Sequence, residues 1–184
     1  MSHSILQILR ESRGGFLHVV DPYKIPVEEA VEKARALAAL RFALLIVGST
    51  DYTLFDSHMP RYLAALKGAA DLRLLLHFPP RKGQGFPICP HADGVLLSCV
   101  DNPTDSYFAE QCVAETRALA RHRAGPCPEF ISSVAYVFGQ DDKSFAAVGA
   151  RPIPTNRPSL DRHAAQARRE GQDCLLYTSP SPRD

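Results

Sequence analysis

The sequence lacks the features that mark several large classes of protein. It has no apolar run approaching the length of a membrane-spanning helix, and its N-terminus has no signal-peptide core. Its 21 basic and 20 acidic residues give a formal net charge of +1, which argues against a protein that grips nucleic acid through phosphates. Its five cysteines are scattered without CxxC spacing, so neither a zinc site nor a disulfide framework is indicated. We therefore expect a cytoplasmic protein with at most peripheral membrane contact.

What is present is a chain long enough to bury a hydrophobic core. The 184 residues are 45% hydrophobic, and one domain is expected over residues 1–173. Residues 174–184 read CLLYTSPSPRD, which matches the translation of a common sequencing adapter. We expect them to be a non-native read-through tail and leave them out of the domain. A disordered tail rich in serine and proline is the alternative.

Segments with helical periodicity alternate with short apolar runs along the chain. Residues 27–40 have apolar positions on one helical stripe, with Glu28 and Glu29 in the first turn. Residues 42–47 are continuously apolar, as in a strand buried on both faces. The same criteria predict further helices at 59–70, 106–122 and 159–169, and further strands at 72–78, 94–99, 130–138 and 144–148. This alternation predicts a parallel α/β architecture, either a (β/α)8 barrel or a doubly wound sheet.

Two apolar runs end on side chains that carry oxygen. The run at 18–20 is followed by Asp21, and the predicted strand 42–47 is followed by Gly48, Ser49 and Thr50. If the two strands are parallel neighbours in a barrel, their carboxyl ends share one face, where Asp21 can meet a hydroxyl group. A carboxylate and a hydroxyl are hard oxygen ligands that suit Mg²⁺. Taken alone, Asp21 before a proline is also the ordinary pattern of a strand-ending turn.

Five motifs follow one another along the chain: DPYK, VGSTDYT, HFP, HADGVLLS and RPIP. In this order and at these distances they resemble the geranylgeranylglyceryl phosphate synthase family, including its bacterial polyprenylglyceryl phosphate synthases. The resemblance implies a (β/α)8 TIM barrel, here incomplete with about five of its eight strands. It implies a Mg²⁺-dependent prenyltransferase that joins a polyprenyl group, taken from its diphosphate, to the C3 hydroxyl of sn-glycerol 1-phosphate in ether lipid synthesis. Barrels of this family often associate, so the parent protein is expected to form homo-oligomers.

The resemblance also assigns roles to individual residues. The metal positions are Asp21 and Thr50, and the substrate-binding positions are Lys24, Gly48 and Ser49. Lys24 would add positive charge against the leaving diphosphate. No catalytic residue is assigned, because the expected general-base glutamate lies beyond residue 173, and Ser179 stands at its position if the tail is native. We expect the 184-residue chain to be inactive, because five strands cannot close a barrel that needs eight, and the two open edges would expose backbone and apolar surface.

Departures from the family leave other interpretations open. Ser49 replaces the usual second glycine, the loop 81–90 is longer than the usual turn, and the glycerol phosphate-binding turns lie past residue 173. Another phosphate-handling barrel, such as an isomerase or a thiamine-phosphate-type synthase, would share the architecture. A non-catalytic α/β domain is a third interpretation. His18, His77 and His91 lie at or near strand ends, and a structural or solvated role is expected for each.

Overall fold

The strands of the sheet lie in space in the order in which they occur in the chain. The computed structural model describes residues 4–11, 18–49, 53, 55–100, 103–122, 126–137, 156–169 and 174–178. The strand order is β1-β2-β3-β4-β5-β6, and the pairs β1–β2, β2–β3, β3–β4 and β5–β6 are parallel. Among the described residues, no helix is both long enough and apolar enough to cross a membrane.

This sequential order decides between the two predicted architectures. A doubly wound sheet reverses its winding once, so at least one pair of consecutive strands is not adjacent. Here every consecutive pair is adjacent, as in a barrel, where each new strand is added beside the previous one. Among the described strands the sheet is open, because β1 and β6 stand at the two ends of the order. The structure therefore favours an incomplete barrel over a doubly wound sheet.

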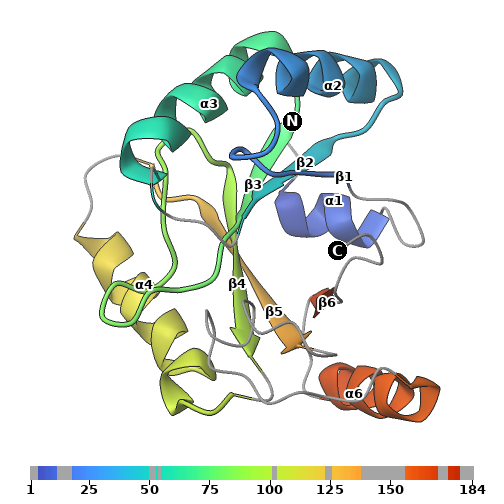
Figure 1. The fold of residues 1–184 in the computed structure, drawn as a ribbon, viewed down its shortest axis with the longest axis vertical. Helices are drawn as coiled ribbons and strands as arrows, with labels where there is room; N and C mark the ends of the chain where they lie inside the picture. The colour runs from blue at the N-terminus through green and yellow to red at the C-terminus, as the bar shows by residue number, and fades with distance from the viewer. Residues whose placement is uncertain are drawn as a thin grey trace. The chain divides into compact units, whose positions relative to one another are not determined.

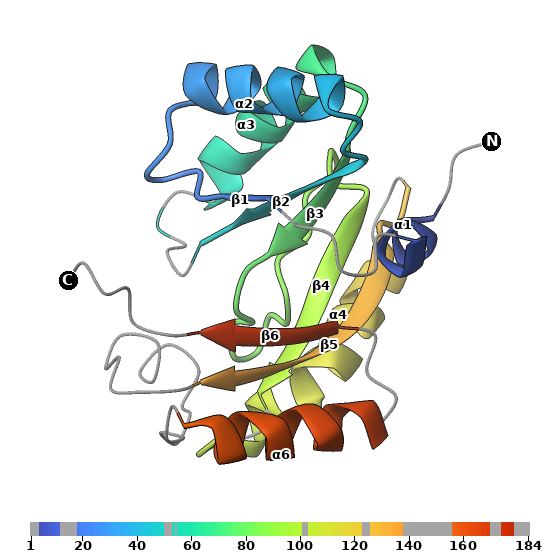
Figure 2. The same ribbon diagram turned by 90° about the vertical axis from the view of Figure 1, so that its right-hand side faces the viewer.

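The chain divides into two compact units, and the first carries the candidate site. It comprises Met1–Phe78, Ile88–Leu96 and Arg123–Ile131. Its elements are α1 (Ile5–Glu11), β1 (His18–Val20), α2 (Val27–Ala39), β2 (Leu44–Gly48), α3 (Phe55–Ala69), β3 (Arg73–His77) and the first parts of β4 (Gly94–Val100) and β5 (Glu129–Val137). Figures 1 and 2 show α2 and α3 side by side against β1 and β2. Every residue of β2 is buried, which confirms the expectation of a strand covered on both faces.

The two long helices bury the faces that their apolar periodicity predicts. In α2 the buried residues are Ala30 and Ala34, one helical turn apart. The helix α3 begins at Phe55, earlier than the predicted start at residue 59. The Phe55 ring packs edge-to-face on Phe78, with ring centroids 5.1 Å apart, so tertiary packing holds the additional first turn.

A short helix that the sequence pattern did not predict packs in the same unit. The backbone N–H groups of Ile5 and Leu6, at the start of α1, donate to the two carboxylate oxygens of Glu129 at 2.7 and 3.0 Å. These N–H groups have no partner inside the helix, and a carboxylate also suits the positive end of the helix dipole. A contact between residues so far apart in sequence leaves no local pattern to recognise.

Asp93, which precedes β4, joins α3 to two strands. Its carboxylate accepts hydrogen bonds from Lys67 Nζ at 2.6 Å, from Arg73 Nη1 at 2.8 Å and from the Leu74 backbone N–H at 2.7 Å. Burial alone would raise the pKa of Asp93, but these three hydrogen bonds outweigh burial and lower the pKa below its ordinary value. The charged form of Asp93 is therefore the one that the fold stabilises.

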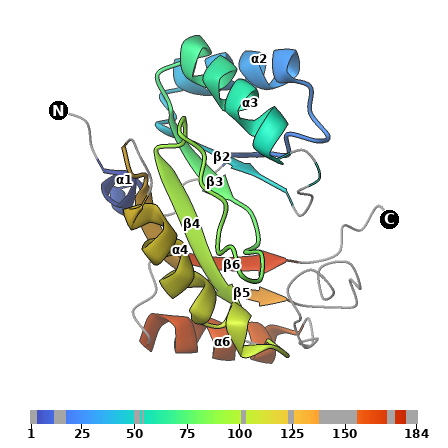
Figure 3. The same ribbon diagram turned by 90° about the vertical axis from the view of Figure 1, so that its left-hand side faces the viewer.

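The second unit comprises Pro79–Pro87, Leu97–His122 and Ser132–Asp184. It contains the 3₁₀ turn η1 (Ser106–Phe108), the helices α4 (Gln111–Arg121) and α6 (Arg157–Arg169), the strand β6 (Cys174–Thr178) and the later parts of β4 and β5. Figure 3 shows α4 alongside β4. The single helix predicted at 106–122 is thus η1 followed by α4. The Asp105 carboxylate accepts from the Tyr107 backbone N–H and starts η1 separately, whereas α4 begins only after Glu110.

The long loop between β3 and β4 is anchored in this unit by two side chains. The Tyr107 hydroxyl accepts from the Gly85 backbone N–H at 3.0 Å and lies 2.6 Å from the Arg81 carbonyl oxygen. Thr116 Oγ1, on α4, accepts from the Phe86 backbone N–H at 2.7 Å. Because these backbone groups are satisfied by side chains, the extra loop residues are held without adding a strand to the sheet.

Residues 174–178 of the expected tail form β6. They pair in parallel with β5, from Ser133 opposite Cys174 to Val137 opposite Thr178 (Figure 2). These residues therefore take part in the sheet, and their run of leucine and tyrosine suits a strand. The domain boundary at residue 173 stays a prediction. Strand pairing reports backbone geometry and not the origin of a residue, so read-through origin stays a prediction. The strand predicted at 144–148 lies outside the described residues.

Candidate functional site

The parallel pairing of β1 and β2 brings Asp21 beside the end of β2, as the sequence predicted. His18 is opposite Leu45 and Val20 is opposite Val47, so the next position after β1, Asp21, is level with Gly48. The carboxyl ends of parallel strands lie at the same edge of the sheet, which in barrels is the edge that carries chemistry. The predicted juxtaposition of the two strand ends is confirmed.

Both carboxylate oxygens of Asp21 are held in place. Oδ1 accepts from the Tyr23 backbone N–H at 3.0 Å, which is the turn geometry expected of aspartate before proline. Oδ2 accepts from Ser49 Oγ at 3.2 Å. The turn therefore does not conflict with the predicted metal site, because one oxygen closes the turn while the other faces the end of β2. The role of Asp21 as a metal ligand stays a prediction.

Lys24 contributes charge to the site without fixed geometry. Its Nζ lies 3.9 Å from Asp21 Oδ2, and its side chain is 83% exposed. An ion pair this exposed contributes little to stability. Its long, mobile side chain instead leaves the ammonium able to reach an anionic ligand bound beside Asp21.

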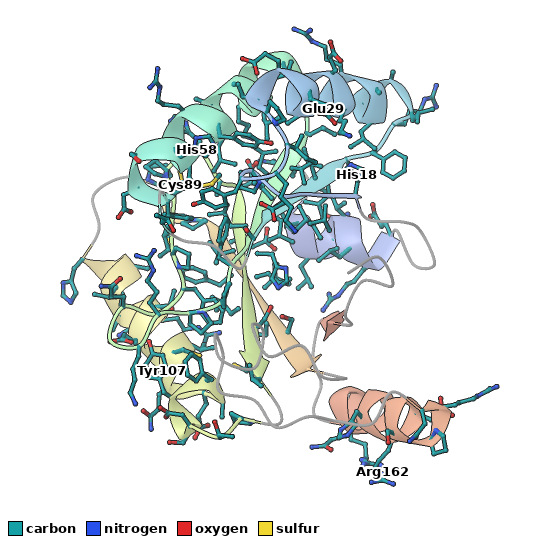
Figure 4. All side chains as sticks on the ribbon, viewed as in Figure 1. His18, Glu29, His58, Cys89, Tyr107 and Arg162 are labelled. Atoms are coloured by element: carbon teal, nitrogen blue, oxygen red, sulfur yellow. The ribbon has the colours of Figure 1, made fainter. Side chains whose placement is uncertain are left out.

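Two side chains of α3 hold the turn that carries Asp21. His58 Nε2 lies 3.1 Å from the Pro22 carbonyl oxygen, and the Tyr62 hydroxyl donates to the Ile25 carbonyl oxygen at 3.1 Å. Figure 4 labels His58 on α3. Burial first, and then the negative charges of Asp21 and Glu29, raise the pKa of Tyr62 to about 12, so this hydroxyl keeps its proton and its hydrogen bond at neutral pH.

Sequence analysis missed the roles of His58 and Tyr62. The spacing of His58 and Tyr62, four residues apart, indicates that both side chains lie on the same face of a helix. Nothing local indicates, however, that this face meets the turn at 22–25. The two side chains fix the backbone on which Asp21 is mounted.

Gly48 is required where β2 runs beside β3. It is paired with His77, and a Cβ atom at position 48 would lie 2.3 Å from the His77 carbonyl oxygen. Any larger residue would push the strand ends apart. Burial lowers the pKa of His77 to about 4, so the imidazole is neutral at physiological pH. The expected structural role of His77 agrees with this environment.

The described oxygen ligands fit Mg²⁺ that keeps most of its water. Such sites use one or two carboxylates together with substrate phosphates. Asp21 supplies one carboxylate, and the Ser49 hydroxyl lies directly beside it. Within the part of the chain that the structure describes, no cluster of three or more histidine, cysteine, aspartate or glutamate residues could hold a metal by itself. Thr50, the second predicted ligand, lies outside the described residues, so its pairing with Asp21 stays a prediction.

Comparison with solved structures identifies the fold. A wild-type GGGPS from Thermoplasma volcanium superimposes with a TM-score of 0.78 at 17% sequence identity, covering 98% of this chain and 71% of that chain. The chain has the fold of these synthases. A second match, with a TM-score of 0.76 at 19% identity, is (S)-3-O-geranylgeranylglyceryl phosphate synthase from Thermoplasma acidophilum in complex with sn-glycerol-1-phosphate, covering 98% of this chain and 72% of that chain.

At this level of sequence identity the likeness establishes the fold class, and it confirms the predicted incomplete (β/α)8 barrel. No family model matches the sequence, and no curated protein matches it. The same fold supports many chemistries, so the function has to be argued from the side chains at the site.

Proposed function

We propose that this chain carries the diphosphate-binding half of a Mg²⁺-dependent prenyltransferase, which transfers a polyprenyl group from its diphosphate to the C3 hydroxyl of sn-glycerol 1-phosphate. The observation that carries the proposal is the Asp21 carboxylate, hydrogen-bonded to Ser49 at the adjoining ends of β1 and β2. The five ordered motifs support it, and so does a fold shared with a synthase whose structure contains sn-glycerol-1-phosphate.

Asp21 and Thr50 would hold the ion together with oxygens of the substrate, and Gly48 and Ser49 would lie against the diphosphate. When bound, Mg²⁺ would neutralise negative charge that develops on the diphosphate as it leaves. One protein carboxylate is enough for such a site, because the substrate supplies further oxygen ligands. Binding of metal and of diphosphate is therefore expected to be interdependent.

The residues of the chain itself do the positioning. Ser49 and the Tyr23 backbone N–H orient the Asp21 carboxylate, and His58 and Tyr62 hold the turn on which it sits. The exposed ammonium of Lys24 would stabilise the negative charge that develops on the leaving diphosphate. Departure of diphosphate leaves a cationic allylic carbon, which the acceptor hydroxyl attacks while a base removes its proton.

We propose that the 184-residue chain binds diphosphate but does not complete the transfer. In the family resemblance, Ser179 stands where the general-base glutamate is expected, and a serine hydroxyl is not basic enough to accept that proton unaided. A homo-oligomeric parent, a cytoplasmic location and the absence of nucleic-acid binding complete the proposal. They follow from the resemblance and the balanced charge.

The proposal is tested by calorimetric titration of the chain with geranylgeranyl diphosphate, with and without Mg²⁺. We expect binding that strengthens with Mg²⁺ and that weakens by at least tenfold in Asp21→Asn, because that change removes the only carboxylate assigned to the site. Asp161→Asn is the matched control, since it removes an exposed carboxylate on α6 that pairs with Arg157 at 3.6 Å. Binding that is independent of Mg²⁺, or equal in the two variants, would refute the proposal.

A further inference from the structure

The helix α6 concentrates positive charge in a chain whose charges are otherwise balanced. It contains one acidic residue, Asp161, and four basic residues, Arg157, Arg162, Arg168 and Arg169. The rest of the sequence has 17 basic and 19 acidic residues, so its formal charge is −2, whereas that of α6 is +3. The other long helices that the structure describes carry less, with −1 on α2 and +1 on each of α3 and α4. The proposed function does not use the charge on α6.

The arginines of α6 whose side chains are described share one exposed side of the helix. Arg157, Arg162 and Arg169 are exposed, and at about 100° per residue they lie within about 140° of the helix circumference. The partly buried Ser159 and His163 lie on the opposite side. Figure 4 shows Arg162 on the side of α6 that points away from β5. These arginines therefore form a straight exposed row about 18 Å long.

Little of this charge is neutralised by the part of the chain that the structure describes. Asp161 lies 3.6 Å from Arg157, and both side chains are largely exposed, so the pair is weak. Among the described residues, no acidic side chain pairs with Arg162 or Arg169. A second copy of the chain would present the same positive row, so two such faces would repel each other. The charge is therefore complementary to an anionic partner of another kind.

We propose that α6 is the surface by which this chain docks on an anionic phospholipid membrane. Four or more basic residues on one helix are the pattern that attracts acidic lipid headgroups, and guanidinium groups match the geometry of phosphate. The exposed row includes no large apolar side chain, so the contact would be electrostatic and peripheral. A membrane is favoured over nucleic acid because the whole chain has a formal charge of only +1. This choice also rests on the proposed function, whose polyprenyl substrate partitions into a bilayer.

The test is flotation of the full chain with vesicles made of equal parts of phosphatidylglycerol and phosphatidylcholine, and with vesicles of phosphatidylcholine alone. We expect binding to the anionic vesicles at about 50 mM NaCl and loss of that binding at about 500 mM, because salt screens exposed charges. The neutral vesicles should not bind. Equal binding to both kinds of vesicle would overturn the proposal. Tighter binding to a DNA duplex than to anionic vesicles, at equal phosphate concentration, would overturn it in favour of nucleic acid.

Paired substitutions test whether α6 is the docking surface. In Arg162→Gln/Arg169→Gln, binding to anionic vesicles should weaken about 30-fold, because each arginine beside such a surface contributes roughly fivefold. Arg162→Lys/Arg169→Lys keeps the charge and should bind nearly as well as the unaltered chain. The matched control is Arg117→Gln/Arg121→Gln, which removes the same charge from exposed positions on α4 and should change binding much less. Equal weakening in the two glutamine variants would overturn the assignment to α6.

The docking surface and the proposed function can fail separately. Vesicle binding is measured without any prenyl diphosphate, so it tests α6 alone. In solution without vesicles, Arg162→Gln/Arg169→Gln should keep the Mg²⁺-dependent binding of geranyl diphosphate, because neither arginine is assigned to the diphosphate site. Loss of that binding in the variant would contradict a role limited to docking.

Discussion

The partly buried imidazole of His77 leads to a quantitative prediction about acid stability. Burial lowers the pKa of His77 from 6.5 to about 4 in the folded chain, whereas the unfolded chain keeps the ordinary value. A group whose pKa is lowered by folding stabilises the folded state above its unfolded pKa, and this stabilisation is lost as the pH falls. The pH window of the loss therefore runs from about 6.5 down to about 4. At about 1.4 kcal/mol per pH unit, full protonation would remove about 3 kcal/mol from the free energy of unfolding.

The measurement is urea unfolding at several pH values across this window. We expect the free energy of unfolding of the unaltered chain to fall steadily below pH 6.5, and that of His77→Gln to fall much less, because glutamine has no charge to acquire. His122→Gln is the control, since His122 is exposed just after α4. The comparison uses the slope with pH, so a general loss of stability in His77→Gln does not affect it. Parallel slopes in the unaltered chain and in His77→Gln would show that the reasoning about burial is wrong.

Three further substitutions test the packing and hydrogen bonding described above. Gly48→Ala would place a Cβ atom 2.3 Å from the His77 carbonyl oxygen and should lower the free energy of unfolding by about 1–3 kcal/mol, measured by thermal unfolding. The matched control Gly68→Ala has open space around it and should raise the free energy of unfolding by up to about 1 kcal/mol. Folding lowers the pKa of Asp93, so its carboxylate stabilises the folded state above pH 3.8, and this stabilisation is lost in more acid solution. Asp93→Asn should remove this contribution, so the free energy of unfolding, followed by circular dichroism during acid titration, should depend less steeply on pH in the variant. An unchanged dependence on pH would contradict this. Thr116→Val leaves a buried amide without its acceptor and should cost about 1–3 kcal/mol in urea unfolding, while Thr116→Ser keeps the hydroxyl and should cost less.

The sequence predicted the parts of this fold that have local causes. The apolar stripe of α2 predicts a helix covered on one face, and the unbroken apolar run of β2 predicts a strand covered on both faces. The structure confirms both predictions. The meeting of Asp21 with the end of β2 was predictable because parallel neighbouring strands end at one edge. Topology therefore brings together two positions, Asp21 and the end of β2, that are far apart in the sequence.

The features that were missed depend on contacts between distant residues. The start of α3 at Phe55 depends on packing against Phe78, and the division of 106–122 into η1 and α4 depends on how Asp105 satisfies a backbone N–H. The support that His58 gives to the site requires knowing which way α3 faces. Propensity and periodicity describe a segment by itself, so they cannot supply these tertiary causes.

The attachment of α1 to Glu129 has a consequence for how the chain folds as it is made. A helix of seven residues is too short to be stable alone in water, and the carboxylate that caps it belongs to a residue 124 positions later. The ribosome therefore releases α1 long before Glu129 has been made. Docking of α1 has to wait until β5 has emerged, so α1 becomes ordered later than segments that are synthesised after it.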